Sequence, residues 1–259
     1  MIRLELSAGI GRITLARPEK RNAFDGTMLA AIGKAIGDWG DDPACRLIIL
    51  GADGQMFCAG ADIGWMAEQA MDGPEANRAG ARALGAVFHA IANSRKPVVG
   101  RIQGAARGGG VGLAAACDIC VASTAASFAL TEVRLGLVPA VISPFVVERL
   151  GPSQARALFM TGDAIDGAEA YRLGLAHHLV APADLDAKVD QIVQSLLAGG
   201  PEALLACKQL VADVAFRQPA EVLEKTVEAI ARRRESAEAQ EGMGAFLERR
   251  PAAWIPQAK

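Results

Sequence analysis

A run of three consecutive glycines, set between an apolar segment and a block of small residues, constrains this chain more than any other feature. Residues 97–102 are typical of a buried strand, Gly108, Gly109 and Gly110 follow, and residues 111–116 predict a helix of small apolar side chains. Glycine lets the backbone turn sharply and lets a ligand approach main-chain N–H groups with no Cβ in the way. The first N–H groups of a helix lack intrahelical partners and lie at the positive end of its dipole. The stretch therefore predicts a site for an anion, either permanent or developing during a reaction.

Two other interpretations of this stretch are open. Residues 110–115 fit the loose G-x-G-x-x-A form of a dinucleotide-binding loop, with Glu132 as the acid that would contact the ribose. Such a loop normally follows the first strand of its domain, whereas about a hundred residues come first here. Glu132 also follows the end of the next apolar run by several residues, which disfavours the dinucleotide. Alternatively, the glycines only allow a helix to pack closely against its neighbours.

A second strand-to-helix junction lies earlier in the chain. Residues 47–50 form a wholly apolar run typical of a buried strand, Gly60 permits a turn, and Asp62 is a suitable cap for a helix that begins at Ile63. The N–H groups around Ala61 would then be free, as those near Gly109 would be. Two converging N–H groups are the arrangement that holds a developing oxyanion.

Strands and helices alternate over most of the chain, which predicts an α/β fold with a largely parallel sheet. Residues 2–6 and 10–15 alternate apolar and polar side chains as a strand hairpin does. Residues 142–150 predict a helix that ends at Gly151 and Pro152, and from residue 153 onward the pattern is helical apart from residues 175–180. We expect a core over residues 1–199 and a helical region over residues 200–259 that covers another surface.

Composition narrows the classes of function. A net charge of −2 gives no support for nucleic-acid binding, and no run approaches the ~20 apolar residues of a membrane span. No signal-peptide pattern is present at the amino terminus, so we expect a cytoplasmic protein without a nucleic-acid or membrane partner. Cys117 and Cys120 fit a buried apolar pair better than a redox or zinc site. His89, His177 and His178 lie on a helix face or a strand and are interpreted as structural, so we expect no metal site.

Four segments resemble the motifs of the enoyl-CoA hydratase/isomerase family, also called the crotonase family. They are RPEKRNAF at residues 17–24, FCAGADI at 57–63, QGAARGGG at 103–110 followed by CDI at 117–119, and FALTEVRLGLVP at 128–139. The resemblance spans the whole chain in the family's order. It implies an α/β fold built as a spiral of ββα units with a helical carboxyl-terminal region. That region, residues 200–259, would be a trimerisation region in homotrimers, which often pair into hexamers.

The resemblance also implies what the site does. The substrate would be an acyl-CoA thioester, and no further cofactor is needed because CoA is part of the substrate. By position, the N–H groups of Ala61 and Gly109 would form an oxyanion hole, and Glu132 would move the proton. The residues implied in CoA contact are Ala59, Ala61, Asp62, Ile63, Gly64 and Gly109 along the channel, then Lys20 and Arg21, and Arg250 or Trp254 from a neighbouring tail.

One position departs from the family's pattern. Hydratases of this family usually carry two glutamates; the second aligns with Glu132, and the first falls at Gly112. Glu132 acting alone would suit double-bond isomerisation, whereas a hydratase would need other groups, or the substrate's own carboxylate, to hold the water. A non-catalytic acyl-CoA-binding or assembly relative is the third interpretation. Residues 131–147 resemble bacterial branched-chain hydratases of the methylglutaconyl-CoA type, which favours hydration. Arg134 would then face a distal carboxylate or form an ordinary ion pair.

Overall fold

Nine strands of the computed structural model, which describes residues 1–256, form two sheets. The larger sheet has six strands in the order β1-β2-β3-β4-β6-β9. Their bounds are Ile2–Ser7, Ile10–Leu15, Leu47–Ala52, Val98–Ile102, Ile119–Ser123 and His178–Val180. β1 and β2 are antiparallel, as the predicted hairpin requires, and every other neighbouring pair is parallel. The prediction of a largely parallel sheet is confirmed.

The smaller sheet is formed by β5 (Ala106–Arg107), β7 (Ser127–Ala129) and β8 (Ala164–Asp166). Isolated bridges extend it, because Cys58 pairs with Ala106 and Phe24 pairs with Ala61. On each turn the chain therefore passes from the larger sheet to the smaller one. In the smaller sheet, the segment from each turn pairs with the segment from the turn before. This is the predicted spiral. It places residues 58, 106 and 128 side by side, just before the segments that carry Ala61, Gly109 and Glu132.

Helices cover both faces of the larger sheet. On one face, α7 (Leu185–Ala198) buries apolar side chains against Leu47, Ile49, Val99 and Val121. On the other face lie α1 (Gly26–Asp41), α3 (Pro74–Ala92) and α4 (Gly109–Ala116). Burial on both faces explains why the central strand β3 is a continuous apolar run, with every residue buried. The remaining helices are α2 (Ile63–Met71), α5 (Ser143–Thr161), α6 (Gly167–Arg172) and short 3-10 helices at Pro18–Lys20, Thr131–Leu135 and Pro182–Asp184.

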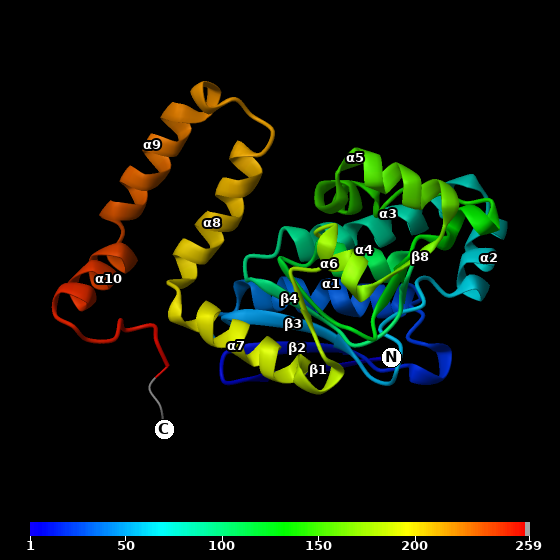
Figure 1. Ribbon diagram of the computed structural model, residues 1–259, viewed down its shortest axis with the longest axis horizontal. Coiled ribbons are helices and arrows are strands. Elements are labelled where there is room, and N and C mark those ends of the chain that lie inside the picture. The colour runs from blue at the N-terminus through cyan, green and yellow to red at the C-terminus, as the bar shows by residue number, and fades with distance from the viewer. Residues whose placement is uncertain (257–259) are drawn as a thin grey trace.

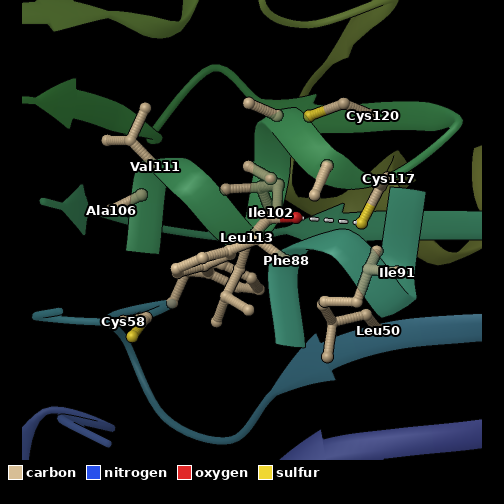
Figure 2. Packing of buried hydrophobic residues seen from close by; sticks show 14 of the residues in the cluster. Leu50, Cys58, Phe88, Ile91, Ile102, Ala106, Val111, Leu113, Cys117 and Cys120 are labelled. Carbon is tan, nitrogen blue, oxygen red and sulfur yellow. Dashed lines mark hydrogen bonds between the residues drawn. The ribbon is translucent and has the colours of Figure 1, made fainter. Parts of the chain in front are cut away.

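The triple-glycine helix α4 runs through the middle of the core. Every residue from 110 to 116 is buried, which explains why this helix is apolar on all sides and has no polar face. Figure 2 shows Val111 and Leu113 of α4 among Phe88, Ile91 and Ile102 from the surrounding elements. The helix is therefore held by packing along its whole length.

Two predictions about the second half of the chain were wrong. The helix predicted to end at Gly151 continues as α5 to Thr161, with a kink at Gly151 (φ 70°, ψ 162°). Pro152 opens the second segment, where its missing N–H costs nothing, so the Gly-Pro pair bends the helix and does not end it. Strand β8 was not predicted, since three residues are too few to show a period of two.

Three helices form a carboxyl-terminal arm, which we define as residues 200–256. They are α8 (Pro201–Val214), α9 (Pro219–Glu235) and α10 (Ala237–Leu247). Figure 1 shows them, in yellow to red, projecting from one side of the core. Lys208 Nζ lies 2.9 Å from Asp118 Oδ2, and Arg46 donates to the carbonyl oxygens of Gly199 (2.9 Å) and Trp254 (2.8 Å). Within residues 1–256, no helix is both long and apolar enough to cross a membrane.

Candidate active site

The two predicted strand-to-helix junctions lie against each other. Gly60 has a φ of 90°, and a Cβ at this position would lie 3.3 Å from the nitrogen of Gly109 and 2.8 Å from the carbonyl oxygen of Arg107. Both the conformation and the close approach therefore require glycine. Within residues 1–256, the N–H groups of Ala61 and Gly109 donate to no protein acceptor, although those of Phe24 and Asp62 beside them are bonded. Two free main-chain donors thus occupy adjacent turns of the spiral.

Each of the three consecutive glycines faces a neighbour that leaves no room for a side chain. Gly108 caps α4 with a φ of 48°, and a Cβ there would lie 3.0 Å from Oε1 of Glu132. A Cβ on Gly109 would enter the ring of Phe24, and one on Gly110 would lie 2.5 Å from the carbonyl oxygen of Cys58. The amino end of α4 is therefore pressed against both the base candidate and the segment that carries Ala61.

Glu132 lies in the 3-10 helix that directly follows β7. Its Oε2 is buried and has no hydrogen-bond partner within the described part of the chain. Burial raises the pKa of Glu132 above its ordinary value, opposed by a hydrogen bond from its own backbone N–H. A carboxylate with a free oxygen and a raised pKa, next to two free N–H donors, is suited to accept and return a proton.

The position of the missing glutamate, Gly112, is filled by other side chains. A Cβ on Gly112 would collide with the γ-methyl of Ile142 and lie 2.9 Å from its Cβ and 3.0 Å from Cε1 of Phe88. Ile142 and Phe88 are both buried. The site therefore holds an apolar wall where a second acid–base group would stand, a feature that the identity of residue 112 alone does not reveal.

The residues implied in CoA contact gather around the amino end of α2. Ala59 N donates to the carbonyl oxygen of Arg21 (3.0 Å), which ties the Pro18–Lys20 turn to this segment. Asp62 accepts from the N–H of Gly64 (3.0 Å) and lies 3.5 Å from Nζ of Lys20. Between them, Ile63 is 59% exposed. The Lys20 ammonium and the main chain of Arg21 thus stand beside an exposed helix start that also offers an apolar surface.

Sequence reasoning missed two residues that hold this corner. Arg17 Nη1 lies 3.2 Å from Asp25 and 3.3 Å from Asp62, and so links the caps of α1 and α2. Asn22 is fully buried, and its side-chain N–H groups donate to the carbonyl oxygens of Asp53 (2.8 Å) and Met56 (2.9 Å). The only sequence signal for Asn22 is its place in the motif at residues 17–24, because nothing local indicates that an asparagine in a loop is buried.

Three other candidates lie outside this group of residues. Arg134 Nη2 pairs with Asp163 at 3.0 Å on the exposed surface, which is the ordinary ion pair considered above. Arg250 is held by Glu241, and Trp254 Nε1 donates to the carbonyl oxygen of Ala198 (3.0 Å). Within one chain, therefore, none of the three joins the site.

His177 and Cys117 take part in packing, whereas His89 and Cys207 are exposed. His177 Nδ1 accepts from the N–H of Cys120 (2.8 Å), and burial together with nearby Arg149 lowers the pKa of His177 to about 4. Burial raises the pKa of Cys117, whose Sγ lies 3.2 Å from the carbonyl oxygen of Leu113 (Figure 2). Across residues 1–256, no three His, Cys, Asp or Glu side chains are grouped so as to hold a metal ion.

Comparison with known proteins agrees with the geometry. The profile of the enoyl-CoA hydratase/isomerase family matches residues 5–257. Crotonyl-CoA hydratase of Syntrophomonas wolfei is 34% identical over 97% of this chain and 96% of its own length. Short-chain-enoyl-CoA hydratase of Clostridium acetobutylicum is 34% identical over 80% of this chain and 79% of its own. The crystal structure of an enoyl-CoA hydratase from Shewanella pealeana gives a TM-score of 0.94 at 36% identity, covering 98% of this chain and 95% of that one. The chain belongs to the enoyl-CoA hydratase/isomerase (crotonase) family.

Proposed function

We propose that this protein is an enoyl-CoA hydratase, which adds water across the double bond of a 2-enoyl-CoA thioester. One observation carries the proposal: Glu132, whose Oε2 is buried and unpartnered within residues 1–256, lies beside the amino end of α4 at Gly109, next to the junction where the N–H of Ala61 is also free. Relatives named as hydratases support hydration over other reactions of an acyl-CoA.

The two N–H groups would act on the thioester carbonyl. When water attacks C3, negative charge develops on the carbonyl oxygen, and the N–H groups of Ala61 and Gly109 stabilise it. Removing one such donor typically costs about 3 kcal/mol of transition-state stabilisation. The step draws on main-chain dipoles and one carboxylate, and it requires no cofactor beyond the CoA of the substrate.

Glu132 would serve as both base and acid because Ile142 and Phe88 occupy the space of a second carboxylate. Its free oxygen accepts a proton from water as the water oxygen bonds to C3, and it then returns that proton to C2. One carboxylate lies on one side of the substrate, so hydroxyl and proton add to the same face. The acyl group we propose is branched or carboxylated, like that of methylglutaconyl-CoA, on the resemblance of residues 131–147.

A second candidate, isomerisation of an enoyl-CoA double bond, is favoured by the same single carboxylate. Glu132 would remove a proton from C2 of a 3-enoyl-CoA and return it at C4, and no water would need to be held. The apolar wall formed by Ile142 and Phe88 would not hinder this reaction.

Absorbance of the conjugated thioester distinguishes the two activities. Purified protein mixed with a panel of 2-enoyl-CoA esters, straight, branched and carboxylated, should lose this absorbance through hydration. A 3-enoyl-CoA would gain it under an isomerase. If CoA esters bind and neither signal changes, the protein is an acyl-CoA-binding or assembly relative and the proposed activity is refuted. Glu132→Gln serves as the matched inactive control, because it keeps size and removes the base.

For CoA itself, we propose contact with the start of α2. Lys20 and Arg21 would meet phosphate groups, while Ala59, Asp62, Ile63 and Gly64 would line the channel. The charges of Lys20 and Arg21 and the exposed apolar surface of Ile63 support this assignment. Replacing both Lys20 and Arg21 by Gln should raise KM and leave kcat within about threefold, since uniform binding is lost. An unchanged KM would contradict it.

We further propose that the carboxyl-terminal arm joins copies of this chain into a homotrimer, or a hexamer made of two trimers, with the core at residues 1–199 and the assembly region at 200–259. Large apolar side chains exposed along the arm support the proposal: Val211, Phe216, Leu223, Val227, Ile230, Phe246 and Leu247. Light scattering after size-exclusion chromatography should give three or six times the chain mass of 26.9 kDa. Val227→Asp should shift it to monomer, whereas Met160→Asp, outside the arm, should not.

A further inference from the structure

Arg107 stands directly before the triple glycine and carries an unusual set of contacts. Its guanidinium donates three hydrogen bonds of 2.9 Å, to the carbonyl oxygens of Ala106 and Ser127 and to the hydroxyl of Ser127. All three acceptors are neutral. Partial burial lowers the pKa of Arg107, and no charged group contributes to that shift. These contacts indicate that the Arg107 side chain holds neighbouring segments in place. They do not form an ion pair.

The backbone of Arg107 contacts the other half of the site. Its N–H donates to the carbonyl oxygen of Cys58 (2.9 Å), and its own carbonyl oxygen lies 2.8 Å from where a Cβ of Gly60 would be. Arg107 therefore contacts the junction that carries Ala61 through its main chain. Through its side chain it contacts Ser127 on β7, the strand that leads to Glu132.

The end of β5 is held by main-chain hydrogen bonds, including Gly108 N to the carbonyl oxygen of Ala129 (2.9 Å), by neighbours packed against the glycines, and by the Arg107 side chain. Strand β5 has only two residues, paired in register as Ala106 with Phe128 and Arg107 with Ala129. The three residues that follow are glycines, which are packed by their neighbours but make no side-chain hydrogen bonds of their own. Two of the three guanidinium hydrogen bonds of Arg107 thus tie the end of β5 to Ser127 of β7, at the point where the chain enters α4.

We propose that Arg107 is a positioning residue. It fixes the spacing between the donors at Ala61 and Gly109 and the base Glu132 by fastening β5 to β7. The inference rests on the proposed function, because it assigns a role within that reaction. Displacing a catalytic group by about 1 Å can lower a rate by about 100-fold, so a fastening of this kind affects turnover more than binding.

The test compares Arg107→Ala, Ser127→Ala, the double variant and Arg107→Lys with the wild type. Arg172→Ala is the matched control, since Arg172 makes two side-chain hydrogen bonds to Glu169 on an exposed helix away from the site. We expect Arg107→Ala to lower kcat roughly 10- to 100-fold with KM within threefold. Ser127→Ala should lower kcat less, the double variant should be no worse than Arg107→Ala, and Arg107→Lys should recover part of the loss.

A second measurement tests how well the site stabilises an oxyanion when no turnover takes place. Acetoacetyl-CoA forms an enolate that absorbs in the ultraviolet, and a site that stabilises oxyanions increases the enolate fraction of the bound thioester. Arg107→Ala should bind acetoacetyl-CoA within threefold of wild type and show less enolate at the same pH. The acid limb of the kcat/KM profile, which reports Glu132, should stay where it is in the wild type.

The outcomes distinguish failure of the proposed activity from failure of the positioning role of Arg107. If the wild type turns over no enoyl-CoA, the proposed function fails first. If the wild type is active and Arg107→Ala keeps kcat within threefold, or raises KM in proportion to its loss of kcat, the positioning role is refuted. Should Arg107→Ala not fold, Ser127→Ala and Arg107→Lys decide: unchanged kcat and unchanged enolate fraction in both would also refute it.

Discussion

Substituting alanine for Gly112 tests whether the space of the missing glutamate is truly filled. Alanine in a helix interior is normally better than glycine by about 1 kcal/mol. Here the added Cβ would meet the γ-methyl of Ile142 and lie 2.9 Å from the Cβ of that residue. A β-carbon cannot move without its backbone, so overpacking of about 1–3 kcal/mol should exceed the helical gain. A contact this close puts the cost in the upper half of that range, so we expect Gly112→Ala to be destabilised by a net ~1–2 kcal/mol, or about 2–8 °C in Tm.

Thermal unfolding by calorimetry measures this, with Gly37→Ala as the control. Gly37 lies inside α1, and a Cβ there would meet nothing within 4 Å, so this variant should gain stability. Combining Gly112→Ala with Ile142→Ala should cost less than the sum of the single changes, because the smaller side chain removes the γ-methyl that the new Cβ meets and leaves only the contact with the Cβ of residue 142. A Gly112→Ala protein as stable as the wild type would show that the wall yields, and the argument that it excludes a second carboxylate would then fail.

Three further predictions concern charged groups. Glu132→Gln should lower kcat at least ~100-fold while CoA-ester affinity stays within threefold in calorimetric titration, and substantial residual turnover would remove Glu132 from its role. Burial raises the pKa of Glu132 above an unfolded value of about 4.3, so the stability it contributes is present below that pH and is lost as pH rises through the folded pKa. Thermal scans from about pH 4 to pH 7 should therefore show Glu132→Gln gaining stability relative to wild type, whereas a constant difference would contradict the burial argument. Lys208→Met should cost about 2 kcal/mol in denaturant unfolding, because it leaves the Asp118 carboxylate, 25% exposed, without its cation. Lys225→Met, which breaks the more exposed pair with Asp213, should cost under about 1 kcal/mol, and equal losses would refute the distinction.

Much of the fold follows from local patterns in the sequence. Apolar runs buried on both faces, alternating with helical periods, predict the parallel sheet. The caps Asp25 and Asp62 predict where α1 and α2 begin, and both accept the expected backbone N–H groups. The triple glycine predicts a junction with free N–H donors, because the need for glycine at a sharp turn depends only on the residues of that turn. Local patterns can reveal these features, since neighbours in the chain produce them.

Other features depend on residues far apart in the chain. Ile142 fills the space beside Gly112 from 30 positions away, and the Arg107 guanidinium reaches Ser127 across the smaller sheet. Glycine at 112 is compatible with a void, a water site or a packed methyl group, and only the fold decides among them. The bend at Gly151 was misjudged for a similar reason, because packing of both helical segments outweighs a local stop signal.

The bridge from Cys58 to Ala106 and the pairing of Ala106 with Phe128 have a consequence for how this scaffold diversifies. Neighbouring strands stand about 4.8 Å apart whatever their side chains are. The separation of the free amides of Ala61 and Gly109 is therefore inherited from the main-chain ladder, and side chains such as Ile142, beside Gly112, are free to change around it. Under the proposed function, selection can reshape which acyl group fits without moving these amides, so recognition and chemistry are able to evolve separately.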